Sequence, residues 1–243
     1  MASGNPKPNF YAAEPLTASL LDPYEGIFHG PNQETSKNLA RMGLVTPTAA
    51  FVGAYNLLDY LLFYPFVDGD DTAAQAMDNT IPLPRYEDGD GVMVMAVAVA
   101  PTTGSGVFTF DYIDHAGNPR TSPAQSCSTT AANIATIATS QQAVAGMPGG
   151  PFLALASGSR GVRSITSVTY SVPNGGLTAL VLVRPLFKMM LQEINTMSEI
   201  ECVTMKTVPL PVLNGAYLNL IVNVAGSIAA GTLIGYCDFY WSE

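Results

Sequence analysis

The sequence predicts an all-β protein with a β-sandwich or jelly-roll-like body and an extended N-terminal arm. Three observations favour this fold class. Apolar segments rich in β-branched and aromatic residues recur about every ten residues, glycine- and proline-rich turns separate them, and almost no segment shows helical periodicity. Turn residues are abundant, because the 243 residues include 22 glycines and 18 prolines. Strands packed as a sandwich are therefore the starting hypothesis.

Residues 1–50 predict the arm. Six prolines interrupt this stretch too often for a long helix. Aromatic residues between the prolines indicate an arm that docks on its own body or on a neighbour. The four aromatic residues expected to make such contacts are Phe10, Tyr11, Tyr24 and Phe28. On this interpretation, deletion of residues 1–30 weakens attachment to a partner more than it weakens folding.

Residues 51–243 predict the body, in which the region around residues 51–80 could form a small subdomain. The apolar and aromatic residues of 54–67 favour a buried strand, although their periodicity also permits a short helix. Residues 92–99 are a continuous apolar run with several valines, which is typical of a strand covered on both faces.

Residues 107–114 alternate between apolar and polar side chains. The alternation predicts a strand with Phe108, Phe110 and Tyr112 on one face. Residues 115–119 contain glycine, asparagine and proline, and predict a hairpin loop.

The middle of the body contains a predicted polar strand at 131–139 and predicted apolar strands at 152–156 and 177–183. The segment 162–172 reads as a half-exposed strand. The sequence Pro-Asn-Gly-Gly at 173–176, between the predicted strands 162–172 and 177–183, is the strongest short hairpin signal in the chain and predicts that these two strands pair. The strand at 177–183 is expected to stop at the Arg-Pro that follows it.

Four further segments complete the chain. Residues 186–198 permit either a helix or a strand, and residues 202–207 predict a strand. Strands are also predicted at 216–224 and at 233–241, the latter with alternate apolar side chains on one face.

Composition narrows the classes of function. The 19 acidic and 10 basic residues give a formal net charge of −9, which argues against a nucleic-acid-binding surface. Only 12% of residues are charged, whereas 48% are hydrophobic and the mean hydropathy is +0.24. A charge-poor, apolar surface indicates that a partner covers part of it, so we expect a homo-oligomer or a component of a larger assembly.

The sequence shows neither a secretory signal nor an apolar run of the roughly 20 residues needed to span a bilayer, so no membrane partner is expected. The three cysteines, Cys127, Cys202 and Cys237, are far apart and predict free, mostly buried thiols.

No catalytic constellation is recognisable. The two histidines, His29 and His115, lack the spacing of a zinc cluster or a Ser-His-Asp triad. Nucleotide-binding and hydrolase motifs are not found either. The six arginines are dispersed and predict solvated surface cations. We therefore expect neither catalytic residues nor a cofactor.

Two acidic clusters support a calcium hypothesis. Each groups hard oxygen ligands around a glycine, as Ca²⁺ sites do, but neither has the spacing of an EF-hand. The favoured interpretation is two solvated acidic loops, with a glycosidase-type acid pair as a further alternative. The clusters are Asp68, Asp70 and Asp71, and Glu87, Asp88 and Asp90.

Four segments resemble a group of tailed-bacteriophage virion proteins. They are residues 81–92, 108–123, 151–165 and 180–186. The resemblance extends over most of residues 35–243, and it is a pattern of turns and strands without a catalytic motif. It implies a structural component of the phage particle, with a head decoration (cement) protein as the expected role.

This resemblance sets the expected partners and location. The protein would be a non-enzymatic virion protein, assembled in the host cytoplasm, that binds the major capsid protein or other virion proteins. Its expected form is a homo-oligomer, with a trimer favoured. The alternatives are a neck, tail or fibre-base component, or a carbohydrate-binding or hydrolytic jelly-roll protein.

Overall fold

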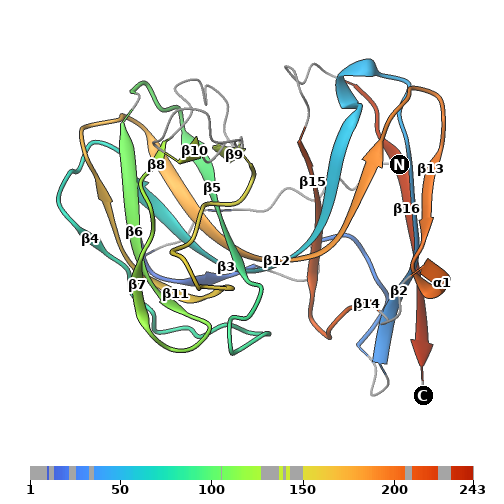
Figure 1. Ribbon diagram of the computed structural model, residues 1–243, viewed down its shortest axis with the longest axis horizontal. Coiled ribbons are helices and arrows are strands. Elements are labelled where there is room, and N and C mark those ends of the chain that lie inside the picture. Colours follow the sequence, from blue (N-terminus) through green and yellow to red (C-terminus); the bar gives the residue numbers. More distant parts are fainter. Residues whose placement is uncertain are drawn as a thin grey trace. The chain divides into compact units, whose positions relative to one another are not determined.

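The computed structural model is built almost entirely of antiparallel β-strands, which confirms the all-β, sandwich-like fold class (Figure 1). The residues that the structure describes are 10, 14–21, 26–32, 36–104, 106–126, 137–138, 141–142, 150–205, 210–223 and 231–242. Contacts divide the chain into two compact units. Unit 1 comprises residues 1–7, 22–59 and 185–243, and unit 2 comprises residues 8–21 and 60–184.

The strands are short at most sheet edges and long at the centres. Their bounds are β1 Ser19–Leu20, β2 Ser36–Val45, β3 Gly53–Asp68, β4 Gln75–Ala76, β5 Met93–Ala100, β6 Val107–Asp114, β7 Pro119–Thr121, β8 Gln125–Ser126, β9 Ile137–Ala138, β10 Gln141–Gln142, β11 Val162–Tyr170, β12 Leu177–Leu191, β13 Ser198–Glu201, β14 Leu210–Pro211, β15 Tyr217–Asn223 and β16 Ile234–Ser242. Helical structure in the described residues is confined to a 3-10 turn at Ala49–Phe51 and the single-turn helix α1 at Cys202–Met205.

Unit 2 is a sandwich of two sheets. One sheet has the strand order β1-β3-β12-β5-β9, and the other has the order β10-β8-β6-β11-β4, with β7 paired to β6. Side chains from both sheets share one core, in which Tyr64, Val94, Phe110 and Leu182 are at most 1% exposed. The long strands β3 and β12 continue from this unit into unit 1.

Unit 1 also buries its core between two layers. In one layer β15 pairs with β3, and in the other β2 lies between β16 on one side and β13 and β14 on the other. The core includes Leu39, Met42, Tyr55 and Leu218. Leu39 and Met42 share this face although they are three residues apart, because a bulge at Ala40 shifts the register of β2 against β16.

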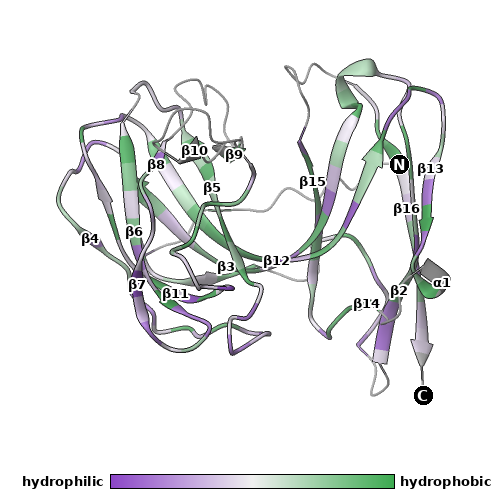
Figure 2. Cartoon of the chain, in the orientation of Figure 1, coloured by the Kyte–Doolittle hydropathy of each residue, from purple (hydrophilic) through white to green (hydrophobic). Residues whose placement is uncertain are grey.

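Strands β3, β5, β6 and β11 confirm the strands predicted at these places. Apolar and polar residues alternate along β6, so that Phe108, Phe110 and Tyr112 are at most 2% exposed. β5 is buried on both faces, as a continuous apolar run predicts. Hydrophobic residues run along its length in Figure 2.

The predicted hairpin at 173–176 is wrong. The strand before it, β11, pairs with β6 and β4, whereas the strand after it, β12, pairs with β3 and β5, so the turn links two sheets. Asn174 N donates to Gly69 O at 2.7 Å, and Thr103 N donates to Asn174 O at 3.0 Å. The turn is therefore fixed by two neighbouring loops rather than by a partner strand.

Three other sequence-based expectations also differ from the structure. β12 does not stop at Arg184-Pro185 but continues as a strand to Leu191. Residues 152–156 form no strand, and Leu153 instead buries its side chain and donates its N–H to Val94 O. Helix α1 replaces the strand predicted from residue 202, whereas most of the strand predicted at 131–139 lies outside the described residues.

The predicted arm over residues 1–50 contains structural elements of both units. Ser36–Val45 forms the central strand of its sheet, β2. The sequence did not predict this strand, because a bulge interrupts its alternation and prolines flank it. β1 pairs with β3, and the nearby Ala18 is fully buried. Deletion of residues 1–30 would remove these contacts, so it does not separate attachment from folding.

Candidate interaction surface

The carboxylates of the first acidic cluster accept hydrogen bonds from backbone N–H groups of their own loop and of one neighbouring turn. Asp68 Oδ1 accepts a hydrogen bond from Asp70 N at 2.9 Å, and Asp71 Oδ1 accepts one from Ala73 N at 2.8 Å. Asp70 Oδ1 accepts a third from Gly175 N at 3.0 Å, which joins this loop to the turn before β12. These carboxylates act as caps for backbone N–H groups, a common role of aspartate in turns.

The second acidic cluster is surrounded by arginine side chains. Arg160 Nε donates to Asp90 Oδ1 at 2.9 Å, Arg163 Nε donates to Asp88 O at 3.1 Å, and Arg184 donates to Asp90 O. The hydrogen bond from Arg160 is the main reason that the pKa of Asp90 lies below its ordinary value. These arginines are dispersed in the sequence and were predicted to be solvated surface cations, since nothing local joins residue 184 to residues 160 and 163.

In the described part of the chain, no three histidine, cysteine, aspartate or glutamate side chains are grouped so that they could hold a metal ion. Asp88 Oδ1 accepts a hydrogen bond from Asp90 N at 3.1 Å, so this cluster also caps its own loop. Aspartates of both clusters thus accept hydrogen bonds from backbone N–H groups.

The two histidines lie in different units. His29, in unit 1, is 7% exposed, and its Nε2 lies 2.8 Å from Ala216 O. His115, in unit 2, accepts a hydrogen bond at Nδ1 from Arg160 N at 3.3 Å. Each histidine therefore connects separate backbone segments of its own unit.

The four aromatic residues predicted to make contacts divide into three cases. Phe10 is buried and packs edge-to-face on Phe63, with ring centroids 5.7 Å apart. Phe28 is 85% exposed, which is the state expected of a partner contact. Tyr11 and Tyr24 lie outside the described residues.

Exposed apolar side chains gather in unit 1. In the described part of the chain, eight of the ten large hydrophobic residues that are exposed belong to this unit, and only Leu20 and Val172 belong to unit 2. We call the eight the exposed apolar set: Phe28, Met190, Ile194, Met197, Val203, Leu213, Ile234 and Trp241. Such a concentration marks unit 1 as the candidate interaction surface.

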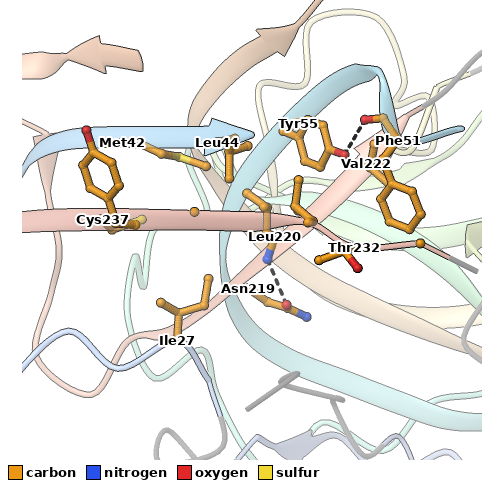
Figure 3. Close-up of a pocket in the computed structure, with 14 residues that line it drawn as sticks. Ile27, Met42, Leu44, Phe51, Tyr55, Asn219, Leu220, Val222, Thr232 and Cys237 are labelled. Carbon is orange, nitrogen blue, oxygen red and sulfur yellow. Dashed lines mark hydrogen bonds between the residues drawn. The ribbon is translucent and has the colours of Figure 1, made fainter. Parts of the chain in front are cut away.

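Unit 1 also contains a pocket of about 630 Å³ (Figure 3). Met42 and Leu44 from β2 line it together with Leu220 and Val222 from β15 and Cys237 from β16. The described lining residues include no carboxylate. Burial is the main reason that the pKa of the Cys237 thiol is raised to about 11, so the thiol stays protonated and unreactive near neutral pH.

The other described cysteine, Cys202, is buried, and neither it nor Cys237 forms a disulfide. Cys127 lies outside the described residues. No helix in the described residues is both long and apolar enough to cross a bilayer. Comparison of the chain with protein families, with curated proteins and with solved structures gives no match.

Proposed function

We propose that this protein is a non-enzymatic structural component of a bacteriophage particle, and that its role is capsid decoration. In this role it bridges shell subunits and stabilises the shell. The observation that carries the proposal is the exposed apolar set in unit 1, on a chain in which only 12% of residues are charged. The resemblance of four sequence segments to tailed-phage virion proteins supports the same role.

The free energy gained by burying the exposed apolar set can be compared with the cost of association. Burial of a large apolar side chain contributes ~1.5–3 kcal/mol, and the eight residues are roughly half exposed, so complete burial of the set would contribute about 6–12 kcal/mol. Association itself costs ~4–15 kcal/mol of lost freedom. One copy would therefore bind weakly, and several linked copies would bind much more tightly.

Because one copy would bind weakly, we expect the protein to act as a homo-oligomer. Its proposed partner is the major capsid protein or another virion protein. Because the proposed surface is completed only by assembled subunits, the protein binds the assembled shell and stabilises it by mass action. A position at the neck, the tail or a fibre base uses the same contacts, and localisation separates these positions from the head surface.

The carbohydrate-binding or hydrolytic alternative requires convergent carboxylates and aromatic side chains around a concave site. The pocket in unit 1 has three aromatic side chains in its lining, those of Phe51, Tyr55 and Tyr236, but its described lining includes no carboxylate. We therefore do not propose that function.

Purified particles from the source of this sequence test the proposal. Quantitative mass spectrometry should find the chain at a copy number comparable to that of the shell subunit, and electron microscopy should place it on the outer surface. Particles that lack the chain would contradict a virion role, and a few copies at one vertex would contradict decoration.

A matched pair of variants tests which surface binds. Phe28→Ser removes a side chain of the exposed apolar set, whereas Val172→Ser removes an exposed side chain of unit 2. Occupancy on shells should fall for Phe28→Ser and stay at the wild-type level for Val172→Ser. Equal occupancy of both variants would contradict attachment through the exposed apolar set at Phe28.

A further inference from the structure

We propose that β16 is an interface strand, to which a second copy of this chain adds its own β16 in antiparallel orientation. The two copies would then share one continuous sheet. This inference concerns the free edge of a sheet in unit 1 and does not depend on a virion role.

β16 lies at the edge of its sheet. It pairs with β2 over its full length, from Ile234 opposite Val45 to Ser242 opposite Ser36, and with no other strand in the described residues. An edge strand presents a row of N–H and C=O groups on its outer side. Such a row is a template for pairing with another chain.

The other described sheet edges carry features that prevent such pairing. β1, β4, β7, β9, β10, β13 and β14 contain two to four residues each. Short edge strands, prolines and exposed lysines are the usual protection against edge-to-edge association. The part of β12 in unit 1 begins with Pro185 and carries the exposed Lys188, so it has two of these features.

β15 is the nearest comparison, because it is also a long strand at the side of its sheet. Residues 26–29 cover its first end: Ile27 N donates to Leu218 O at 2.7 Å, and His29 Nε2 lies 2.8 Å from Ala216 O, just before the strand. Among the described residues, no backbone hydrogen bond links β16 to a segment other than β2, although the His29 ring lies 6.2 Å from that of Phe239. Of the long edges there, it is the one that has neither a backbone hydrogen bond from another segment nor a protective proline or lysine.

The composition of β16 suits strand pairing. Its nine residues, Ile-Gly-Tyr-Cys-Asp-Phe-Tyr-Trp-Ser, include no proline and no lysine. Aromatic residues at this density have a high β-propensity. The single charged residue is Asp238, and its carboxylate lies 3.9 Å from Arg41 Nε, which partly neutralises its charge.

A second β16 is the partner that fits this edge. Two-fold pairing covers both free edges in one step and closes, whereas pairing with an unlike edge would leave one β16 exposed. A register centred on Asp238 would place two carboxylates directly opposite each other. A register centred on Phe239 avoids this, because Asp238 then faces Tyr240 of the second copy.

Exposure along β16 agrees with an uncovered interface. Ile234 at one end is 58% exposed, and Trp241 at the other end is 45% exposed. Both belong to the exposed apolar set, and both lie on the strand that the second copy would join. Two-fold pairing gives a dimer, which differs from the trimer favoured by the sequence analysis.

Sedimentation velocity of the full chain tests the inference. The wild-type protein should be a dimer at micromolar concentration. Lysines placed at the two positions of β16 that face each other in this register, as Asp238→Lys with Tyr240→Lys, should produce a monomer, since each lysine then lies opposite a lysine of the second copy. The control, Val203→Lys with Met197→Lys, replaces similarly exposed residues outside β16 and should remain a dimer.

A wild-type monomer or trimer would overturn the inference, as would a dimer of the β16 variant. Circular dichroism establishes that both variants are folded. If the β16 variant does not fold, hydrogen exchange of the wild-type protein decides the question. Half of the β16 amides should lose protection on dilution while those of β2 keep it, and protection independent of concentration would refute the pairing.

Discussion

Arg160 donates a hydrogen bond from Nε to Asp90 Oδ1 at 2.9 Å, although 70 residues separate the two in the sequence. The contact joins the turn before β11 to the loop before β5. Arg163 and Arg184 donate to backbone carbonyls of the same loop. The acidic cluster is therefore an exposed junction whose carboxylate is paired with an arginine of the same chain.

The Arg160–Asp90 pair can be tested by titration. Arg160→Gln should raise the pKa of Asp90 toward its ordinary value of 3.8, because the hydrogen bond from Arg160 is the largest cause of the lowered pKa. Carboxyl chemical shifts followed by NMR measure this. Arg163→Gln is the control, since Arg163 donates to the Asp88 carbonyl and should change the pKa of Asp90 less. An equal shift in both variants would contradict a specific pair.

Asp114 should make folding sensitive to acid. Its side chain is 1% exposed, and its pKa lies below the ordinary value, chiefly because the N–H of Asn118 donates to it and also because Arg120 and Ala116 do. A lowered pKa in the folded state gives stability that is present above the ordinary value of 3.8 and is lost as pH falls through the folded value.

Asp114→Asn should therefore unfold at a lower denaturant concentration than the wild type near neutral pH, and the gap should narrow below pH 3.8. Denaturant titrations near neutral pH and below pH 3.8 measure this difference in unfolding midpoint. Asp71→Asn, which removes the charge from a capping side chain in an exposed loop, is the control and should show a smaller gap. A gap for Asp114→Asn that does not change with pH would contradict the assignment.

Tyr64 should contribute to stability through its hydroxyl. The hydroxyl donates to Asn79 Oδ1 at 2.6 Å and accepts from Ile165 N at 3.1 Å, and burial raises the pKa of Tyr64 to about 12. Tyr64→Phe leaves a buried N–H without its acceptor, so the free energy of unfolding should fall by about 1–3 kcal/mol. The control, Tyr240→Phe at a half-buried position, should change it by less than about 0.5 kcal/mol.

The turn before β12 depends on glycine at position 176. Gly176 has a φ of +71°, and an added Cβ would lie 2.3 Å from Pro101 O. Gly158 has a φ of +85° but no atom within 4 Å of an added Cβ. Gly158→Ala therefore measures the cost of the left-handed backbone conformation without a steric clash. Gly158→Ala should cost roughly 1–2 kcal/mol of unfolding free energy. Gly176→Ala should cost more, and equal losses in calorimetry would contradict the steric argument.

Lys37 is a buried cation, and its replacement should stabilise unit 1. The residue is 2% exposed, Nζ donates to Pro31 O at 3.3 Å, and burial lowers the pKa of the ammonium. The lowered pKa destabilises the folded state while the ammonium is charged. This cost is complete below the folded pKa and disappears as pH rises toward 10.5.

Lys37→Met should therefore exceed the wild type in unfolding free energy near neutral pH, and the advantage should shrink as pH approaches 10.5. Chemical denaturation across this range measures it. The control, Lys188→Met at an exposed position, should differ from the wild type by less than about 0.5 kcal/mol throughout. A wild type more stable than Lys37→Met would contradict the interpretation.

Local patterns predicted the strands with clear periodicity. β6 alternates apolar and polar residues, and β5 is continuously apolar, so the burial of each follows from the side chains themselves. β2 was missed because a bulge at Ala40 breaks its period of two. The Pro-Asn-Gly-Gly turn was correctly located but wrongly paired, because a turn sequence specifies a chain reversal and not the sheet that the next strand joins.

The candidate surface was predicted only in part. A charge-poor, apolar composition indicated a partner, and Phe28 is indeed exposed, but Phe10 packs inside the protein's own fold. Nothing local distinguishes these two phenylalanines. The arginines around Asp90 and the uncovered edge of β16 both depend on residues that are far apart in the sequence, so no local pattern could have found them.

By itself the sequence determined the all-β class, the position of most of the long strands and the apolar, charge-poor composition. These properties depend on side-chain periodicity and composition, which are local. The tertiary structure alone decided which strands share a sheet, which charged side chains meet and which edge stays uncovered. Those outcomes depend on long-range packing, in which each strand competes for a partner against every other strand of the chain.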